Sequence, residues 1–130
     1  MNLLLDTHIV LWWLADDPAL PEAAAEVIAD PGTIAVVSAA SVWEIAIKRA
    51  SGRLEIPDDL LGVLEEGAFE PLPITAVHAL AAGGLPAHHH DPIDRILVAQ
   101  ARCEGLTLVS VDERFAEYEV ELLDLSLRTR

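Results

Sequence analysis

The chain has 130 residues and a net charge of −14, from 8 Lys and Arg against 22 Asp and Glu. This length fits one domain with a real core, and a hydrophobic fraction of 52% excludes an intrinsically disordered chain. The acidic charge and an aromatic content of 5% argue against a generic nucleic-acid binder that relies on surface charge and base stacking. A lone cysteine, Cys103, excludes an intrachain disulfide and is typical of a reducing compartment.

The stretch from Leu3 to Leu14 is apolar, but it differs from a signal peptide because it lacks a basic start and contains Asp6 and His8. It is also too short to span a bilayer. We therefore expect a soluble, cytoplasmic protein without a membrane partner. The excess of acid has two interpretations, a solubilising surface or attraction to a basic protein partner.

Strand and helix patterns alternate along the chain, which is typical of an α/β fold with right-handed crossovers. The first half predicts, in order, strand Leu3–Leu5, helix Ile9–Ala15, helix Pro21–Ala29, strand Ile34–Val37 and helix Ser38–Ala50. The second half predicts helix Pro57–Glu66, strand Glu70–Pro73, helix Thr75–Ala82, helix Pro92–Glu104, strand Thr107–Val111, a helical turn at Glu113–Glu117 and strand Val120–Leu125. Five strands with helices between them predict one domain over residues 1–130, built as a three-layer α/β/α sandwich.

Four acidic residues stand just past apolar runs, in the helix after the second strand or at the start of a later helix. They are Asp6, Glu44, Asp94 and Asp112. The carboxyl ends of parallel strands form the edge at which open α/β sheets bind ligands. Carboxylates that converge there repel one another unless a cation compensates, and an all-oxygen set suits Mg²⁺ or Mn²⁺. The sequence therefore predicts a metal-dependent site that cleaves phosphodiester bonds.

Helix capping is the structural alternative for each of these acids. Asp6 can cap the helix that begins near Ile9, and Asp112 can cap the turn that follows it. Asp91 followed by Pro92 is a strong helix start, which explains Asp91 fully and Asp94 in part. Capping does not explain why four separate elements bring carboxylates to one edge of the sheet.

Glu44 depends most on where its helix begins. Ser41 and Glu44 match an S-x-x-E capping box, which would occupy the Glu44 carboxylate. A helix that begins at Ser38 instead leaves Glu44 nearly two turns in, where it can project toward the strand ends. Lys48, four residues later, is either a salt-bridge partner of Glu44, the interpretation we favour, or a cation that faces phosphate.

Two further features lie near the acids. Arg95 is adjacent to Asp94 and is a second candidate for contact with an RNA phosphate. His88, His89 and His90 form a tract in a loop, where consecutive residues cannot easily face one ion. We expect a polar loop with one histidine toward substrate or partner, and not a zinc site.

Together these residues resemble the PIN-domain toxins of the VapC type. The matching blocks are Asp6-Thr7-His8 with Leu11-Trp12, then Ser38–Lys48, Leu85–Arg95 and Leu108–Tyr118. They occur in order from Leu3 to about Tyr118. The sequence departs from the family pattern at Ile93, where Phe is commoner, and at His88 and His90, which flank the one expected histidine.

The resemblance implies a parallel sheet in 3-2-1-4-5 order and a Mg²⁺- or Mn²⁺-dependent endoribonuclease of a toxin–antitoxin pair. It places the metal and catalytic positions on the four acids, and gives Thr7 and Ser110 supporting or water-positioning roles. It also implies RNA as substrate, an antitoxin with a basic segment as partner, and a homodimer.

Two other functions compete with the nuclease. A haloacid-dehalogenase-like phosphatase also places Asp after its first strand, but it needs a second Asp where this chain has His8. A catalytically silent PIN-like interaction module is the other alternative, and the presence of all four acids argues against it.

Overall fold

The computed structural model describes residues 1–88 and 90–126. Its first half contains β1 (Asn2–Leu5), α1 (Thr7–Leu14), α2 (Glu22–Ala29), β2 (Ile34–Ser38) and α3 (Ala39–Ala50). Its second half contains α4 (Leu60–Glu66), β3 (Glu70–Leu72), α5 (Ala76–Gly83), α6 (Pro92–Glu104), β4 (Thr107–Val109) and the 3-10 helix η1 (Glu113–Glu117). Within the described ranges, no helix combines the length and apolarity needed to cross a membrane.

The sheet is parallel, with strand order β3-β2-β1-β4 across the described residues. β1 is central, and its Leu4 pairs in register with Val36 of β2 and Leu108 of β4. Leu3, Leu4 and Leu5 are all fully buried, as expected for a parallel strand covered on both faces. Pro71 lies in β3 at the edge of the sheet, where a missing backbone donor is tolerated.

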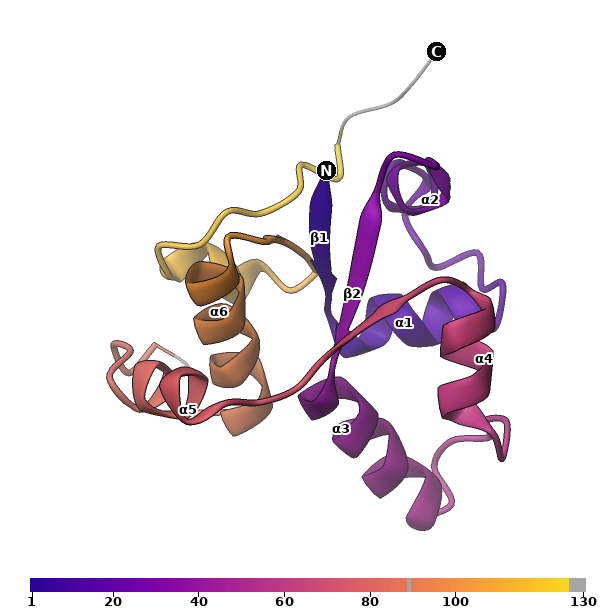
Figure 1. Ribbon diagram of the computed structural model, residues 1–130, viewed down its shortest axis with the longest axis horizontal. Coiled ribbons are helices and arrows are strands. Elements are labelled where there is room, and N and C mark those ends of the chain that lie inside the picture. Colours follow the sequence, from indigo (N-terminus) through magenta and orange to yellow (C-terminus); the bar gives the residue numbers. More distant parts are fainter. Residues whose placement is uncertain (89, 127–130) are drawn as a thin grey trace.

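Alternation along the strands divides the core into two halves, one on each face of the sheet. Leu3 and Leu5 face the half formed with α1, α2, α3 and α4, which contribute the buried residues Ile9, Val10, Ala24, Ile28, Ile45, Leu60 and Leu64. Leu4 faces the half formed with α6 and η1, whose buried residues include Leu97, Val98 and Phe115. Figure 1 shows α5 and α6 on one side of β1 and β2, and α1, α2 and α4 on the other. The predicted three-layer α/β/α sandwich is confirmed.

The predicted fifth strand, Val120–Leu125, is reduced to one parallel bridge between Leu108 and Leu122. The backbone N–H of Leu108 donates to Glu121 at 2.8 Å, and that of Leu123 donates to Leu108 at 3.0 Å. The segment thus lies beside β4, in the fifth place of the predicted order, but it does not continue as a strand. The side chain of Asp124 accepts hydrogen bonds from Ser126, which closes a turn there.

α4 also differs from the prediction, because it begins at Leu60 and not at Pro57. Asp59 is its N-cap, and the Asp59 carboxylate accepts from the backbone N–H of Gly62 at 3.1 Å. The acid, and not the proline, therefore sets the start of this helix.

Candidate metal centre

Asp6 occupies the carboxyl end of β1 and is the N-cap of α1. Its Oδ1 accepts from the backbone N–H of Thr7 at 2.7 Å, and its Oδ2 accepts from the hydroxyl of Ser110 at 2.7 Å. Only 6% of Asp6 is exposed. Burial raises the pKa of the Asp6 carboxyl, an effect that these two hydrogen bonds oppose. Asp6 is thus both a cap and a buried, oriented carboxylate at the sheet edge.

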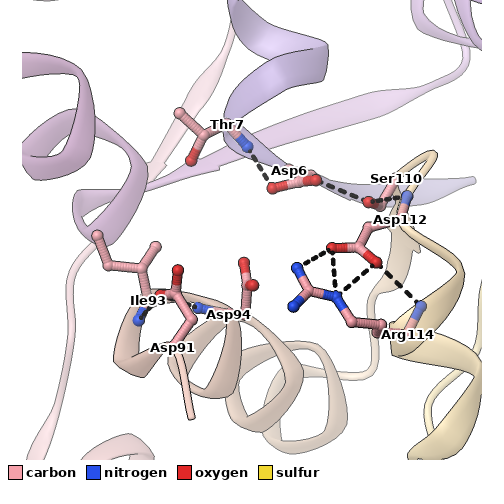
Figure 2. A network of polar contacts seen from close by, with 8 residues as sticks. All are labelled: Asp6, Thr7, Asp91, Ile93, Asp94, Ser110, Asp112 and Arg114. Carbon is pink, nitrogen blue, oxygen red and sulfur yellow. Dashed lines mark hydrogen bonds and ion pairs between the residues drawn. The ribbon is translucent and has the colours of Figure 1, made fainter. Parts of the chain in front are cut away.

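Ser110 connects the ends of β1 and β4. Its hydroxyl donates to the Asp6 carboxylate and accepts from the backbone N–H of Asp112 at 3.0 Å, so it fixes the carboxylate of Asp6 and the backbone of Asp112 (Figure 2). These contacts are compatible with the supporting role that the family resemblance implies for Ser110, which stays a prediction. Thr7 supports Asp6 through its backbone only, because its buried hydroxyl donates to Ser41 at 3.0 Å.

Asp112 is the N-cap of η1 and holds the guanidinium of Arg114. Its Oδ1 accepts from the backbone N–H of Arg114 at 3.0 Å and from Nε at 3.1 Å. Its Oδ2 accepts from Nε at 3.2 Å and from Nη2 at 2.8 Å. Sequence reasoning missed Arg114. The usable signal was a D-x-R spacing directly after a strand, which puts both side chains on one helical turn.

Asp94 lies in the first turn of α6, behind the N-cap Asp91. Asp91 accepts from the backbone N–H groups of Ile93 at 2.8 Å and Asp94 at 3.3 Å, so its predicted capping role is confirmed. Burial is the largest cause that raises the pKa of the Asp94 carboxyl, and the negative charges of Asp91, Asp6, Asp112 and Glu44 add to it in that order. Together they bring this pKa to about 7, which shows that the predicted acids act on one another.

Glu44 is in the second turn of α3, because Ser38 caps this helix and accepts from the backbone N–H of Ala40 at 3.0 Å. The alternative S-x-x-E box therefore does not form. The Glu44 carboxylate is 3.9 Å from the ammonium of Lys48, with the two side chains 22% and 26% exposed. This is the salt bridge that the spacing favoured.

Arg95 is held by backbone groups beside the predicted site. Its guanidinium donates to the backbone carbonyls of Ala82 at 2.8 Å, Leu85 at 2.9 Å and Pro86 at 2.9 Å. These bonds tie the end of α5 and its following loop to α6. A contact with an RNA phosphate would have to share or replace these bonds, and it stays a prediction.

The histidine tract is described only in part. The ring of His88 packs edge-on against Tyr118, with centroids 5.2 Å apart. His89, the histidine that matches the family pattern, lies outside the described residues.

The donor set fits a hard divalent cation, although it is not preassembled. Figure 2 shows the carboxylates of Asp6, Asp94 and Asp112 around one region between the sheet edge and α6. Across residues 1–88 and 90–126, no three His, Cys, Asp or Glu side chains already stand in an arrangement that could hold a metal ion. The carboxylates would have to draw together around an ion, and the attraction of each carboxylate to that ion would have to outweigh their mutual repulsion.

Comparison with known proteins places this geometry in a family. The PIN domain family matches residues 3–121. The chain is 32% identical to Ribonuclease VapC22 of Mycobacterium tuberculosis over 120 residues, which cover 90% of this chain and 92% of VapC22.

Solved structures share the fold. The DNA-bound VapBC of Salmonella typhimurium aligns with a TM-score of 0.71 and 18% identity. The alignment covers 96% of this chain and 98% of the VapBC chain. VapBC2 from Rickettsia felis, bound to a promoter DNA fragment, aligns with a TM-score of 0.70 and 15% identity, covering 95% and 98%. The chain belongs to the PIN-domain family and is related within it to the VapC proteins, as its motifs predicted.

Proposed function

We propose that this protein is a Mg²⁺- or Mn²⁺-dependent endoribonuclease, the toxin of a toxin–antitoxin pair. The observation that carries the proposal is the arrangement of Asp6, Asp94 and Asp112 around one region at the sheet edge, with Asp6 only 6% exposed and held by two hydrogen bonds (Figure 2). Burial and four neighbouring acids also raise the pKa of the Asp94 carboxyl to about 7. A cluster of this kind costs free energy in the absence of a cation, and such clusters are typical of functional sites. The relationship to a protein named as a ribonuclease supports the reaction class.

In this proposal Asp6 and Asp94 hold the ion directly, and Asp112 and Glu44 complete its shell directly or through water. When bound, an ion of this type would supply Lewis-acid polarisation of a phosphate and would lower the pKa of a water molecule. Ser110 keeps one oxygen of Asp6 turned toward β4 through its 2.7 Å hydrogen bond, and the backbone of Thr7 fixes the other. The protein's own contribution is therefore to hold four carboxylates, against their repulsion, where a cation can join them.

The acidic charge of the chain makes the cation necessary for substrate binding as well as for chemistry. At a net charge of −14 the protein repels the RNA backbone, and the four acids add to that repulsion at the point of contact. Neutralising them allows the phosphate to approach.

Cleavage of a fluorogenic RNA by the purified protein tests the proposal. We expect activity that EDTA abolishes and that added Mg²⁺ or Mn²⁺ restores, and loss of that activity in Asp6→Asn and Asp94→Asn. Glu66→Gln, an exposed acid at the end of α4, removes the same charge and serves as the control. Metal-independent cleavage, or wild-type rates in either Asp variant, would contradict the proposal. A folded protein that binds Mn²⁺ but cuts no RNA would favour the interaction module.

We also propose a cognate antitoxin with a basic segment, and a homodimer. The excess of 22 acidic over 8 basic residues supports a basic partner. Co-expression with the proposed antitoxin should suppress RNA cleavage, and high salt should weaken that complex. Sedimentation of the isolated chain should give twice the monomer mass, and a monomer at micromolar concentration would contradict the dimer.

A further inference from the structure

Arg114 engages both oxygens of the Asp112 carboxylate. The backbone N–H of Arg114 donates to Oδ1 at 3.0 Å, and Nη2 donates to Oδ2 at 2.8 Å. The single Nε–H lies between the two oxygens, with Nε at 3.1 and 3.2 Å from them. A divalent ion that binds this carboxylate directly has to compete with the guanidinium for its oxygens.

The other basic side chains assigned to this region are committed elsewhere. Lys48 pairs with Glu44 at 3.9 Å, and the guanidinium of Arg95 donates to three backbone carbonyls. Figure 2 shows Arg114 turned toward Asp112, on the side that Asp94 also faces. A positive charge therefore already lies against one proposed metal ligand, beside the acids that repel each other.

This contact is built to be exchanged. Arg114 and Asp112 are two residues apart on one turn, so their contact is local in the chain. The Arg114 side chain is 64% exposed and that of Asp112 is 27% exposed. Exposed ion pairs are weak, and the released guanidinium can be hydrated at once.

We propose that Arg114 is a resident counter-cation of the carboxylate cluster, which a divalent ion must displace from Asp112. The proposal rests on the metal site proposed above. Arg114 is a positioning residue that acts through Asp112: it holds this acid apart from Asp6 and Asp94 before the ion arrives. Competition between the guanidinium and the ion then sets the metal concentration at which the site fills.

Titration of the purified protein with Mn²⁺, with free Mn²⁺ followed by electron paramagnetic resonance and no RNA present, tests this directly. Arg114→Gln removes the charge, and Arg114→Lys keeps it. Arg49→Gln is the matched control, because Arg49 pairs with Asp58 away from the acids and its loss changes the net charge equally. Circular dichroism and thermal melting establish that each variant is folded.

We expect Arg114→Gln to bind Mn²⁺ with a Kd about threefold to tenfold lower than the wild type, as the loss of a weak competing ion pair predicts. Arg114→Lys and Arg49→Gln should remain within about twofold of the wild type. An unchanged or higher Kd in Arg114→Gln would overturn the proposal, and so would an equal gain in Arg49→Gln.

The titration also distinguishes the counter-cation role of Arg114 from the proposed metal site on which it rests. If Asp6→Asn binds Mn²⁺ as the wild type does, the metal site itself is wrong. If Asp6→Asn loses binding while Arg114→Gln matches the wild type, the site stands and only the counter-cation role fails.

Discussion

The raised pKa of Asp94 makes a sharp prediction for Asp94→Asn, an almost isosteric change that removes the charge. The pKa of the folded carboxyl is about 7 against an ordinary value of 3.8. Ionisation therefore opposes folding. The penalty is absent below the unfolded pKa, grows as the pH rises, and is complete above the folded pKa. The metal-free wild type should lose stability, relative to Asp94→Asn, between about pH 4 and pH 7.

The magnitude follows from the same numbers. A rise of about 3 in pKa corresponds to about 4 kcal/mol at 1.36 kcal/mol each. Asp94 is only partly buried, so solvent screening reduces this to about 2 kcal/mol. The variant also loses a favourable interaction with the N-terminus of α6, worth about 0.5 kcal/mol. We expect Asp94→Asn to be more stable than the wild type by about 1.5 kcal/mol at pH 8.

Urea unfolding in EDTA at pH 4, 6 and 8 measures this difference. The gap should be widest at pH 8 and should close at pH 4. Glu66→Gln, the exposed charge-matched control, should show no such widening. Saturating Mn²⁺ should reverse the order at pH 8, because only the wild type keeps the full set of ligands. A gap that does not vary with pH, or a less stable variant at pH 8, would refute the reasoning.

Two further substitutions test the contacts around the cluster. Ser110→Ala should lower the free energy of unfolding by about 1–3 kcal/mol, because buried Asp6 loses a charge-assisted hydrogen bond. Urea unfolding measures this beside Ser110→Thr, which keeps the hydroxyl. Equal stability of Ser110→Ala and the wild type would count against the Ser110–Asp6 hydrogen bond. Arg95→Lys should lose about 1–3 kcal/mol without changing RNA affinity, because an ammonium cannot reproduce the fork that spans three carbonyls. An unchanged stability with weakened RNA binding would favour the phosphate contact of Arg95 instead.

The strand-and-helix order was predictable because its signals are local. Leu3–Leu5 is a short apolar run followed by a cap, and Asp91 with Pro92 starts a helix by side-chain and ring geometry alone. The convergence of the acids followed from the rule that parallel strands end at one edge. The strand order was predictable only from the family motifs, because no single run of residues specifies it.

The features that the sequence did not show depend on which hydrogen-bonding partner a side chain or strand contacts in the folded chain. The segment predicted as the fifth strand, Val120–Leu125, keeps only one bridge to β4 and runs into a turn that Asp124 closes at Ser126. Arg95 was placed by its neighbour in sequence, but its guanidinium turns to the loop after α5. Arg114 was overlooked because a D-x-R spacing on the surface is common, and only the folded chain aims it at a proposed ligand.

The central claim is that Asp6 and Asp94 hold a divalent cation, and anomalous diffraction from Mn²⁺-soaked crystals tests it most directly. The account predicts a manganese peak bonded to carboxylate oxygens of Asp6 and Asp94 at about 2.1 Å, with Asp112 moved off Arg114 to reach the ion or its water. A peak at other residues, or no peak at saturating Mn²⁺ in a lattice that leaves this edge open, would contradict it.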